Sequence, residues 1–195
     1  SGENWFDLSL EMTAPGGERF SAADIQRLIQ SGQSSTRLKN RKVAVFDPGT
    51  VAAGVLTKSK TCSAAVTWCR DSLKNGSART LVVNSGNANA FTGQKGRDAV
   101  EITAKFAADA TGGMPDEVYL ASTGVIGVNL KMPALRNGIP RAAAALSPEG
   151  GADAAIAIMT TDPFPKSAAV EVVTPSGTFR VGGMTKGSGM IEPRM

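Results

Sequence analysis

The chain has 195 residues, a mass of 20.1 kDa and a formal net charge of +4, with two cysteines and no histidine. Its 42% hydrophobic and 19% charged residues are typical of one soluble globular domain, and no apolar run is long enough to predict a transmembrane helix. The missing histidine excludes a Ser-His-Asp or Cys-His nucleophile made by this chain alone, and too few ligands remain for a structural zinc site.

The first residues, SGENWFDLSL, have neither the basic nor the apolar region of a signal peptide. We therefore expect Cys62 and Cys69 to be free thiols in a reducing cytoplasm. The densest basic group, RLKNRK at residues 37–42, has no aromatic residues within it, which favours a solvated loop over a nucleic-acid surface. A mildly basic protein also suits an anionic small-molecule substrate.

The N-terminal half of the chain has patterns of one short helix and several strands. FSAADIQRLIQSG, at residues 20–32, has a capping serine, an apolar stripe and a terminal glycine, which predict a short helix. The turn DPGT lies between two strand-like runs and predicts a β-hairpin over residues 43–57. AAVTWC, at residues 64–69, is a further candidate strand, and the apolar run RTLVVNSG, at residues 79–86, predicts a buried strand.

The clearest helix is predicted in GRDAVEITAKFAADATGG, at residues 96–113. Its helical spacing places on one face Ala99, Ile102, Phe106 and Ala110. The remaining patterns predict a strand at 116–123, a helix at 132–146 broken near Gly138–Pro140, a helix at 151–161, and a hairpin at 168–183. This mixture favours an α/β or α+β layered domain with a mixed sheet.

The segment VVNSGNANAFTGQKG, at residues 82–96, is the most unusual in composition, with three glycines and three asparagines after the predicted buried strand. Both residue types tolerate left-handed backbone. An elaborate turn and a polar loop lining a site are equally compatible with it. Its glycine spacing fits neither a dinucleotide-binding fingerprint nor a phosphate-binding loop.

Three further segments have both a structural and a functional interpretation. In LASTGVIG, Thr123 and Gly124 form an ordinary turn, or they aim a hydroxyl and an N–H at one point as an oxyanion hole requires. In IMTTDPFPK, Thr160 is a helix-end residue or a hydroxyl offered to a polar ligand. Lys186, followed by glycine, is a loop lysine or a cation that binds a carboxylate.

Together, four segments resemble those of one family in order and spacing: VVNSGNANAFTG, ASTGVIG, AIMTTDPFPK and GGMTKGSGMIEPRM. The chain is similar to the glutamate N-acetyltransferase family, also called ornithine acetyltransferase. The resemblance covers residues 43–195 and leaves 1–42 as a divergent N-terminal segment. It implies a precursor that cuts itself between Ala and Thr, giving an α chain and a β chain. The present chain, ending at Met195 one residue short of that Ala, resembles the α chain.

The resemblance implies that the N-terminal Thr of the β chain takes the acetyl group of N-acetylornithine and passes it to glutamate, in arginine biosynthesis. Such a threonine uses its own α-amine as base and needs no histidine. Thr123 and Gly124 would form the oxyanion hole, and Thr160 and Lys186 would bind substrate. No metal or organic cofactor is implied, although acetyl-CoA is a possible acetyl donor.

The implied fold is α/β (α+β), a layered αββα-type sandwich with mixed sheets, of the N-terminal-nucleophile type. The β chain would complete it, in a heterotetramer of two α and two β chains. Residues 1–42 depart from the usual family pattern, which leaves the amine substrate open. The alternatives are a related amidase or aminopeptidase, an acyltransferase for another amine, and a non-catalytic homologue kept for assembly.

Overall fold

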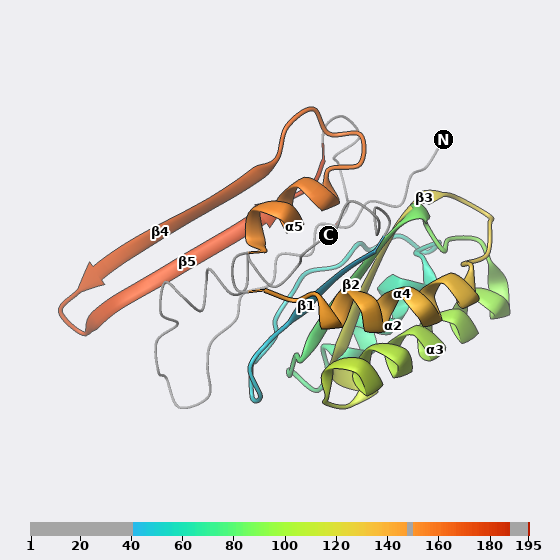
Figure 1. Cartoon of the computed structure of the whole chain (residues 1–195), viewed down its shortest axis with the longest axis horizontal. Coiled ribbons are helices and arrows are strands. Elements are labelled where there is room, and N and C mark those ends of the chain that lie inside the picture. The colour runs from blue at the N-terminus through green and yellow to red at the C-terminus, as the bar shows by residue number, and fades with distance from the viewer. Residues whose placement is uncertain (1–40, 148–149, 188–194) are drawn as a thin grey trace.

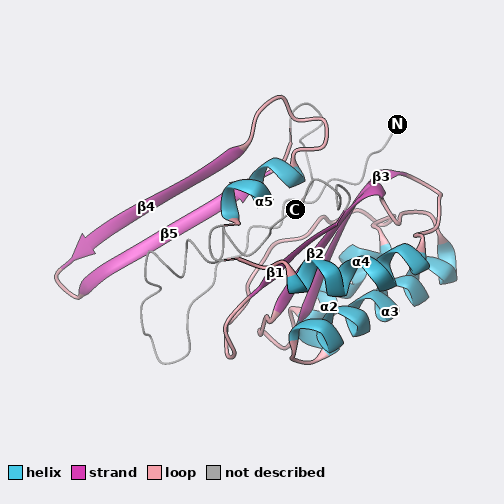
Figure 2. Cartoon of the chain, viewed as in Figure 1, coloured by secondary structure: helices cyan, strands magenta, loops and turns pink. Residues whose placement is uncertain are grey.

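A computed structural model describes residues 41–147, 150–187 and 195. Figure 1 shows helices gathered on a small sheet, and a long two-stranded hairpin that projects away from it. Figure 2 gives the same view by type of secondary structure. The predicted helix at residues 20–32 lies outside the described residues, and the domain boundary after residue 42 stays a prediction.

The sheet has the strand order β1-β2-β3 and is mixed, as the sequence predicts. Strand β1 (Arg41–Val45) pairs antiparallel with β2 (Thr80–Asn87), and β2 pairs parallel with β3 (Val118–Val125). A parallel pair needs a crossover connection, which here is α3 (Gly93–Thr111) followed by the short 3-10 helix η1 (Pro115–Glu117). The predicted buried strand, the clearest helix and the strand after it are confirmed.

Helices α3 and α4 (Met132–Ala144) cover one face of this sheet. Their shared core with the strands consists mainly of alanine and branched aliphatic side chains: Val43, Val82, Val100, Ala104, Ala107, Val118, Leu120, Leu135, Ile139 and Ala142. Small alanine side chains let the two helices approach the sheet closely. The predicted apolar face of α3 is rotated, because Ile102 is 43% exposed whereas Val100 and Ala104 are buried.

Residues 64–69, predicted as a strand, lie instead in helix α2 (Ala64–Ser72). Ser63 caps the helix by accepting a hydrogen bond from the N–H of Val66 at 3.4 Å. Val66 and Cys69 of this segment are buried, and Trp68 Nε1 donates to the carbonyl of Val118 on β3 at 2.8 Å. Tertiary contacts therefore outweigh the local strand propensity in this segment.

The predicted hairpin over residues 43–57 is also wrong. The turn itself exists, since the N–H of Thr50 donates to the carbonyl of Asp47 at 3.1 Å. After the turn, however, Val51 forms only an isolated bridge with Ser77, and β1 pairs with β2. A turn signal predicts a reversal of the chain without saying which strands pair.

The C-terminal part contains α5 (Gly151–Ile158), β4 (Lys166–Thr174) and β5 (Gly177–Thr185). The two strands form the predicted antiparallel hairpin. The predicted break in the preceding helix is absent, because α4 continues through Pro140. No helix in the described part of the chain combines the length and apolar character needed to cross a membrane.

Candidate active site

The first predicted pair, Thr123 and Gly124, lies at the carboxyl end of β3. Register places Thr123 beside Ser85 and Gly124 beside Gly86 on the parallel neighbour β2. Gly124 has φ of 132°, and a side chain there would lie 2.6 Å from the carbonyl oxygen of Gly86. Only glycine fits both the backbone conformation and the close approach. Gly86 and Gly124, one from each of the two polar segments, are thus neighbours on adjacent strands.

A buried polar contact lies just before this point. The hydroxyl of Ser122 donates to Asn84 Oδ1 at 2.6 Å, and Asn84 Nδ2 donates to the carbonyl of Asn87 at 3.0 Å. Asn84 and Ser122 are 8% and 4% exposed. These bonds join the ends of β2 and β3 and hold the backbone of Asn87 in place.

The loop after β2 is held by Asn89, which is fully buried with φ of 50°. Its Nδ2 donates to the carbonyl of Gly96 at 3.0 Å, and its Oδ1 accepts from the hydroxyl of Thr92 at 2.9 Å. The N–H of Ala88 also donates to the carbonyl of Val125 at 3.0 Å. The asparagine-rich segment therefore fixes the loop against the end of β3, which is the structural interpretation of its composition.

The same segment also lines a cavity of about 220 Å³ between the end of β2 and the start of α4. The lining consists of polar residues of β2 on one side and residues at or just before the start of α4 on the other: Asn84, Ser85, Gly86, Asn87, Leu130, Lys131 and Leu135. Sequence patterns gave no signal for the contribution of Leu130, Lys131 and Leu135. Both interpretations of residues 82–96 thus have structural support.

The second predicted pair, Thr160 and Lys186, lies near the base of the hairpin. Thr160 is exposed and has φ of 50°, which is rare for a β-branched residue. The turn that carries it is closed by the N–H of Asp162, which donates to the carbonyl of Met159 at 2.9 Å. Strained backbone of this kind is enriched at functional sites.

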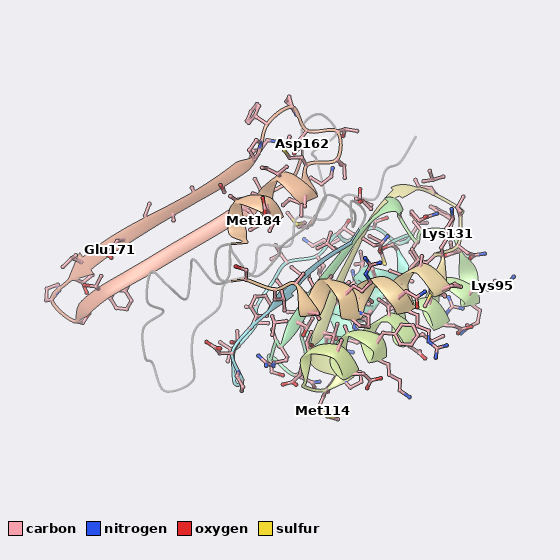
Figure 3. All side chains as sticks on the ribbon, viewed as in Figure 1. Lys95, Met114, Lys131, Asp162, Glu171 and Met184 are labelled. Carbon is pink, nitrogen blue, oxygen red and sulfur yellow. The ribbon has the colours of Figure 1, made fainter. Side chains whose placement is uncertain are left out.

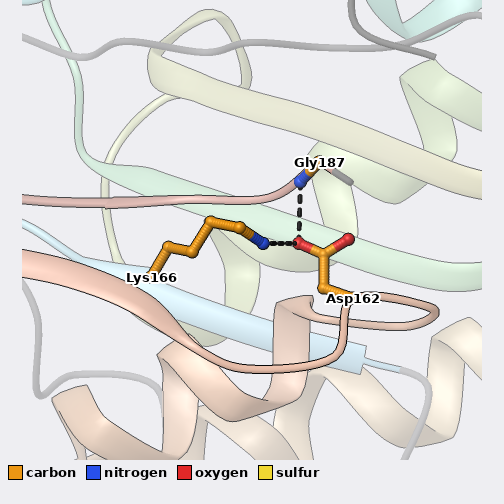
Figure 4. A network of polar contacts seen from close by, with 3 residues as sticks. All are labelled: Asp162, Lys166 and Gly187. Carbon is orange, nitrogen blue, oxygen red and sulfur yellow. Dashed lines mark hydrogen bonds and ion pairs between the residues drawn. The ribbon is translucent and has the colours of Figure 1, made fainter. Parts of the chain in front are cut away.

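A polar network around Asp162, shown in Figure 4, reaches the residue that follows Lys186. Its Oδ2 accepts hydrogen bonds from Lys166 Nζ at 2.6 Å and from the N–H of Gly187, the residue after Lys186, at 2.7 Å. Burial raises the pKa of the Asp162 carboxyl, but these two hydrogen bonds and the nearby charges of Lys166 and Lys186 outweigh it and hold the pKa below its ordinary value. Sequence reasoning missed Lys166, for which the i,i+4 spacing is the only signal.

Of the four predicted residues, Thr123 and Gly124 are neighbours on β3. Thr160 lies two residues before Asp162, and Lys186 directly precedes Gly187, whose N–H binds the Asp162 carboxylate. Helix α5, which leads into the second pair, contacts β1 and β5. The roles assigned to these four residues stay predictions.

Comparison with known proteins decides the family. Residues 28–195 match the ArgJ family model. The chain belongs to the ArgJ family. This confirms the resemblance to the ornithine acetyltransferases, and the match begins upstream of residue 43, where the resemblance read from the sequence starts.

Two ArgJ relatives illustrate the similarity in sequence. The "Arginine biosynthesis bifunctional protein ArgJ" of Bradyrhizobium diazoefficiens is 49% identical over 170 residues, covering 86% of this chain and 41% of the relative. The protein of the same name from Synechococcus sp. is 47% identical over 194 residues, covering 98% of this chain and 45% of the relative. The present chain thus spans less than half the length of these curated relatives.

Two solved structures share the ArgJ fold. Ornithine acetyltransferase from Mycobacterium tuberculosis, solved in complex with ornithine, has a TM-score of 0.76 and 31% identity, covering 95% of this chain and 98% of that one. The ArgJ protein of Bacillus halodurans has a TM-score of 0.69 and 27% identity, again with 95% and 98% coverage. The mixed α/β architecture is therefore that of the ornithine acetyltransferases.

Proposed function

We propose that this chain is the α chain of an acetyltransferase that moves an acetyl group from N-acetylornithine to glutamate in arginine biosynthesis, in the cytoplasm. The observation that carries the proposal is the contrast in coverage. The chain covers 41% of a curated ArgJ protein but 98% of a chain of the solved ornithine acetyltransferase. The solved enzyme thus contains a separate chain of about this length, and the rest of the precursor would form the β chain.

In the proposed reaction, the hydroxyl of the N-terminal Thr of the β chain attacks the acetyl carbonyl of N-acetylornithine. The α-amine of that Thr accepts the hydroxyl proton and returns it to the departing amine, so that ornithine leaves and an acetyl-enzyme remains. The amine of glutamate then attacks the acetyl-enzyme, its proton passes through the α-amine to the Thr oxygen, and N-acetylglutamate leaves with the Thr hydroxyl restored. The transfer needs neither a metal nor an organic cofactor, although acetyl-CoA could replace N-acetylornithine as donor.

Each attack places negative charge on the carbonyl oxygen, which the Thr123 hydroxyl and the Gly124 N–H would stabilise. The backbone of β3 supports a Gly124 N–H that points away from β2 and so can reach a ligand. The N–H and C=O of Leu120 each contact Cys69 Sγ at 3.3 Å, on the open side of β3 away from β2. Since the backbone groups of a strand alternate in direction, Gly124, four residues later, directs its N–H to the same open side.

Substrate binding is assigned to Thr160 and Lys186. An ammonium group near the substrate binds a carboxylate, which both N-acetylornithine and glutamate carry. The exposed hydroxyl of Thr160, held in a strained turn, would complete the contact. The polar network around Asp162 supports the pairing of these residues in one place.

An exposed apolar face on the β4–β5 hairpin supports the proposal of a partner chain. On one face of the hairpin, register brings together Val170, Val172, Phe179 and Val181. These side chains are 57%, 46%, 44% and 60% exposed. A two-stranded hairpin with an exposed apolar face is marginally stable by itself. We propose that the β chain covers this apolar hairpin face, completing an αββα sandwich of the N-terminal-nucleophile type and a heterotetramer of two α and two β chains.

The test uses the full-length precursor and its two mature chains. Thr123→Ala should lower kcat for acetyl transfer by about 10²–10³-fold, because one oxyanion donor is lost. Thr61→Ala, in an exposed loop, is the matched control and should leave kcat unchanged. Normal turnover by Thr123→Ala would remove Thr123 from the site. Release of acetate without N-acetylglutamate from the wild-type protein would favour the amidase alternative over the transferase.

A further inference from the structure

The loop between α5 and β4 contains a buried carboxylate that the proposed mechanism does not use. Asp162 is 5% exposed, and its side chain is 1% exposed. Its position is marked in Figure 3, at the base of the hairpin and far from Glu171 near the hairpin tip. A buried carboxylate is costly unless charged or N–H groups compensate it, so its partners should indicate why it is there.

These partners connect Asp162 to both proposed substrate-binding residues. The backbone N–H of Asp162 closes the turn that holds Thr160 in its left-handed conformation. The carboxylate accepts from the N–H of Gly187, which fixes the backbone directly after Lys186. Asp162 therefore connects two segments, the Thr160 turn and the backbone at Gly187, which is 25 residues from Asp162 in sequence.

Lys166 is the ion-pair partner of this carboxylate, at 2.6 Å from Asp162 Oδ2. Its ammonium group also lies 4.9 Å from the centre of the Phe164 ring, which helps to hold it in position. Within the described residues, Oδ1 of Asp162 has no hydrogen-bond partner, so the compensation depends on the two bonds to Oδ2.

We propose that Asp162, paired with Lys166, is a positioning residue that assembles Thr160 and Lys186 into one binding site for the substrate carboxylate. The proposal rests on the proposed function of those two residues. Asp162 acts through the Thr160 turn and the Gly187 backbone and does not itself touch the substrate. Its loss should weaken substrate binding more than the chemical step, because the oxyanion hole on β3 and the threonine nucleophile remain in place.

The experiment measures KM and kcat of the two-chain enzyme for N-acetylornithine and glutamate. Asp162→Asn removes the charge and keeps the shape, and Lys166→Met removes the compensating ammonium group. Both should raise KM for both substrates about tenfold, the loss expected for a displaced charge-assisted hydrogen bond, with kcat changed less than about threefold. The matched controls are Asp71→Asn and Lys74→Met, which break an exposed ion pair of the same 2.6 Å length and should change neither constant.

The outcomes separate a positioning role from a purely structural one. A lower fraction of folded enzyme would reduce the apparent kcat and leave KM unchanged, and that result would overturn the proposal. If Asp162→Asn does not fold, the half-buried Lys166→Met variant decides by the same criterion. A third variant, Lys186→Met, tests the proposed function separately. If Lys186→Met leaves KM unchanged, Lys186 does not bind substrate; if it raises KM while both other variants do not, only the role of Asp162 fails.

Discussion

At the residue scale, Gly124 is the position where the local geometry leaves least choice. Its φ of 132° is already unfavourable for any other residue, and a Cβ there would lie 2.7 Å from the backbone nitrogen of Asn87. The obstacle is backbone on the neighbouring strand, which cannot rotate away as a side chain could. The Thr-Gly pair is visible in the sequence, but this contact depends on β2 lying beside β3 in a specific register.

Gly124→Ala should therefore destabilise the protein by about 2–4 kcal/mol, from backbone strain and overpacking together. Gly127→Ala is the matched control, since Gly127 also has a positive φ of 79° but has open space where the Cβ would be. The control should cost only about 1 kcal/mol, from backbone strain alone. Urea unfolding of the two variants measures the difference, and equal losses would show that the strands separate easily at Gly86 and Gly124.

At the element scale, α2 protects the open edge of β3. Trp68 donates to one carbonyl of that edge, and the thiol of Cys69 contacts both backbone groups of Leu120. An uncovered strand edge is a site for unwanted pairing with other chains. The helix thus supplies side-chain partners where a further strand would otherwise supply backbone partners. Burial raises the pKa of the Cys69 thiol to about 11, because the ionised form is excluded from this dry contact.

This raised pKa predicts a loss of stability at alkaline pH. The thiol of the unfolded chain ionises near its ordinary pKa of 9.0, whereas that of the folded chain ionises near 11. The contribution is therefore fully present below pH 9 and falls between pH 9 and 11, by about 2–3 kcal/mol in total. Cys69→Ser, which keeps a donor and an acceptor, should lack this fall.

Melting temperatures of both proteins at pH 8, 9 and 10 test the prediction. This window is chosen because Tyr119, whose pKa is raised to about 12 by burial and by nearby Cys69 and Asp116, contributes mainly above its ordinary pKa of 10. Parallel curves for the wild-type protein and Cys69→Ser would show that the thiol is not excluded from water in solution.

The elements that sequence patterns predicted correctly are those with strong local signals. Helix α3 has a long helical repeat and a glycine stop, and the β4–β5 hairpin has a turn between two β-rich runs. The errors are at α2 and at residues 43–57, where partners distant in sequence decide the structure. For the candidate site, a motif predicts Thr123 and Gly124, whose role stays a prediction, whereas no motif indicated Lys166, because its contact with Asp162 depends on where β4 begins.

At the scale of the whole molecule, helices cover the three-stranded sheet of the described chain, whereas the β4–β5 hairpin is largely exposed. Two hydrophobic clusters lie on the sheet, where α2, α3 and α4 provide cover. The hairpin extends away from this core (Figure 1), with its apolar face exposed. Because the chain spans less than half of its curated relatives, the missing cover is consistent with sequence outside this chain.

Val170→Asp should therefore disrupt the proposed assembly with a β chain while leaving the sheet and its helices folded. Val170 is opposite Val181 in the hairpin register, and both are more than half exposed within this chain. If the β chain covers them, a buried carboxylate there costs several kcal/mol.

Ile102→Asp is the matched control, because Ile102 is a similarly exposed aliphatic side chain, 43% exposed, on the outer side of α3. Size-exclusion chromatography of both variants, expressed as the full precursor, measures assembly. Loss of the heterotetramer in Val170→Asp alone is the expected result, whereas normal assembly of both variants would place the β chain elsewhere.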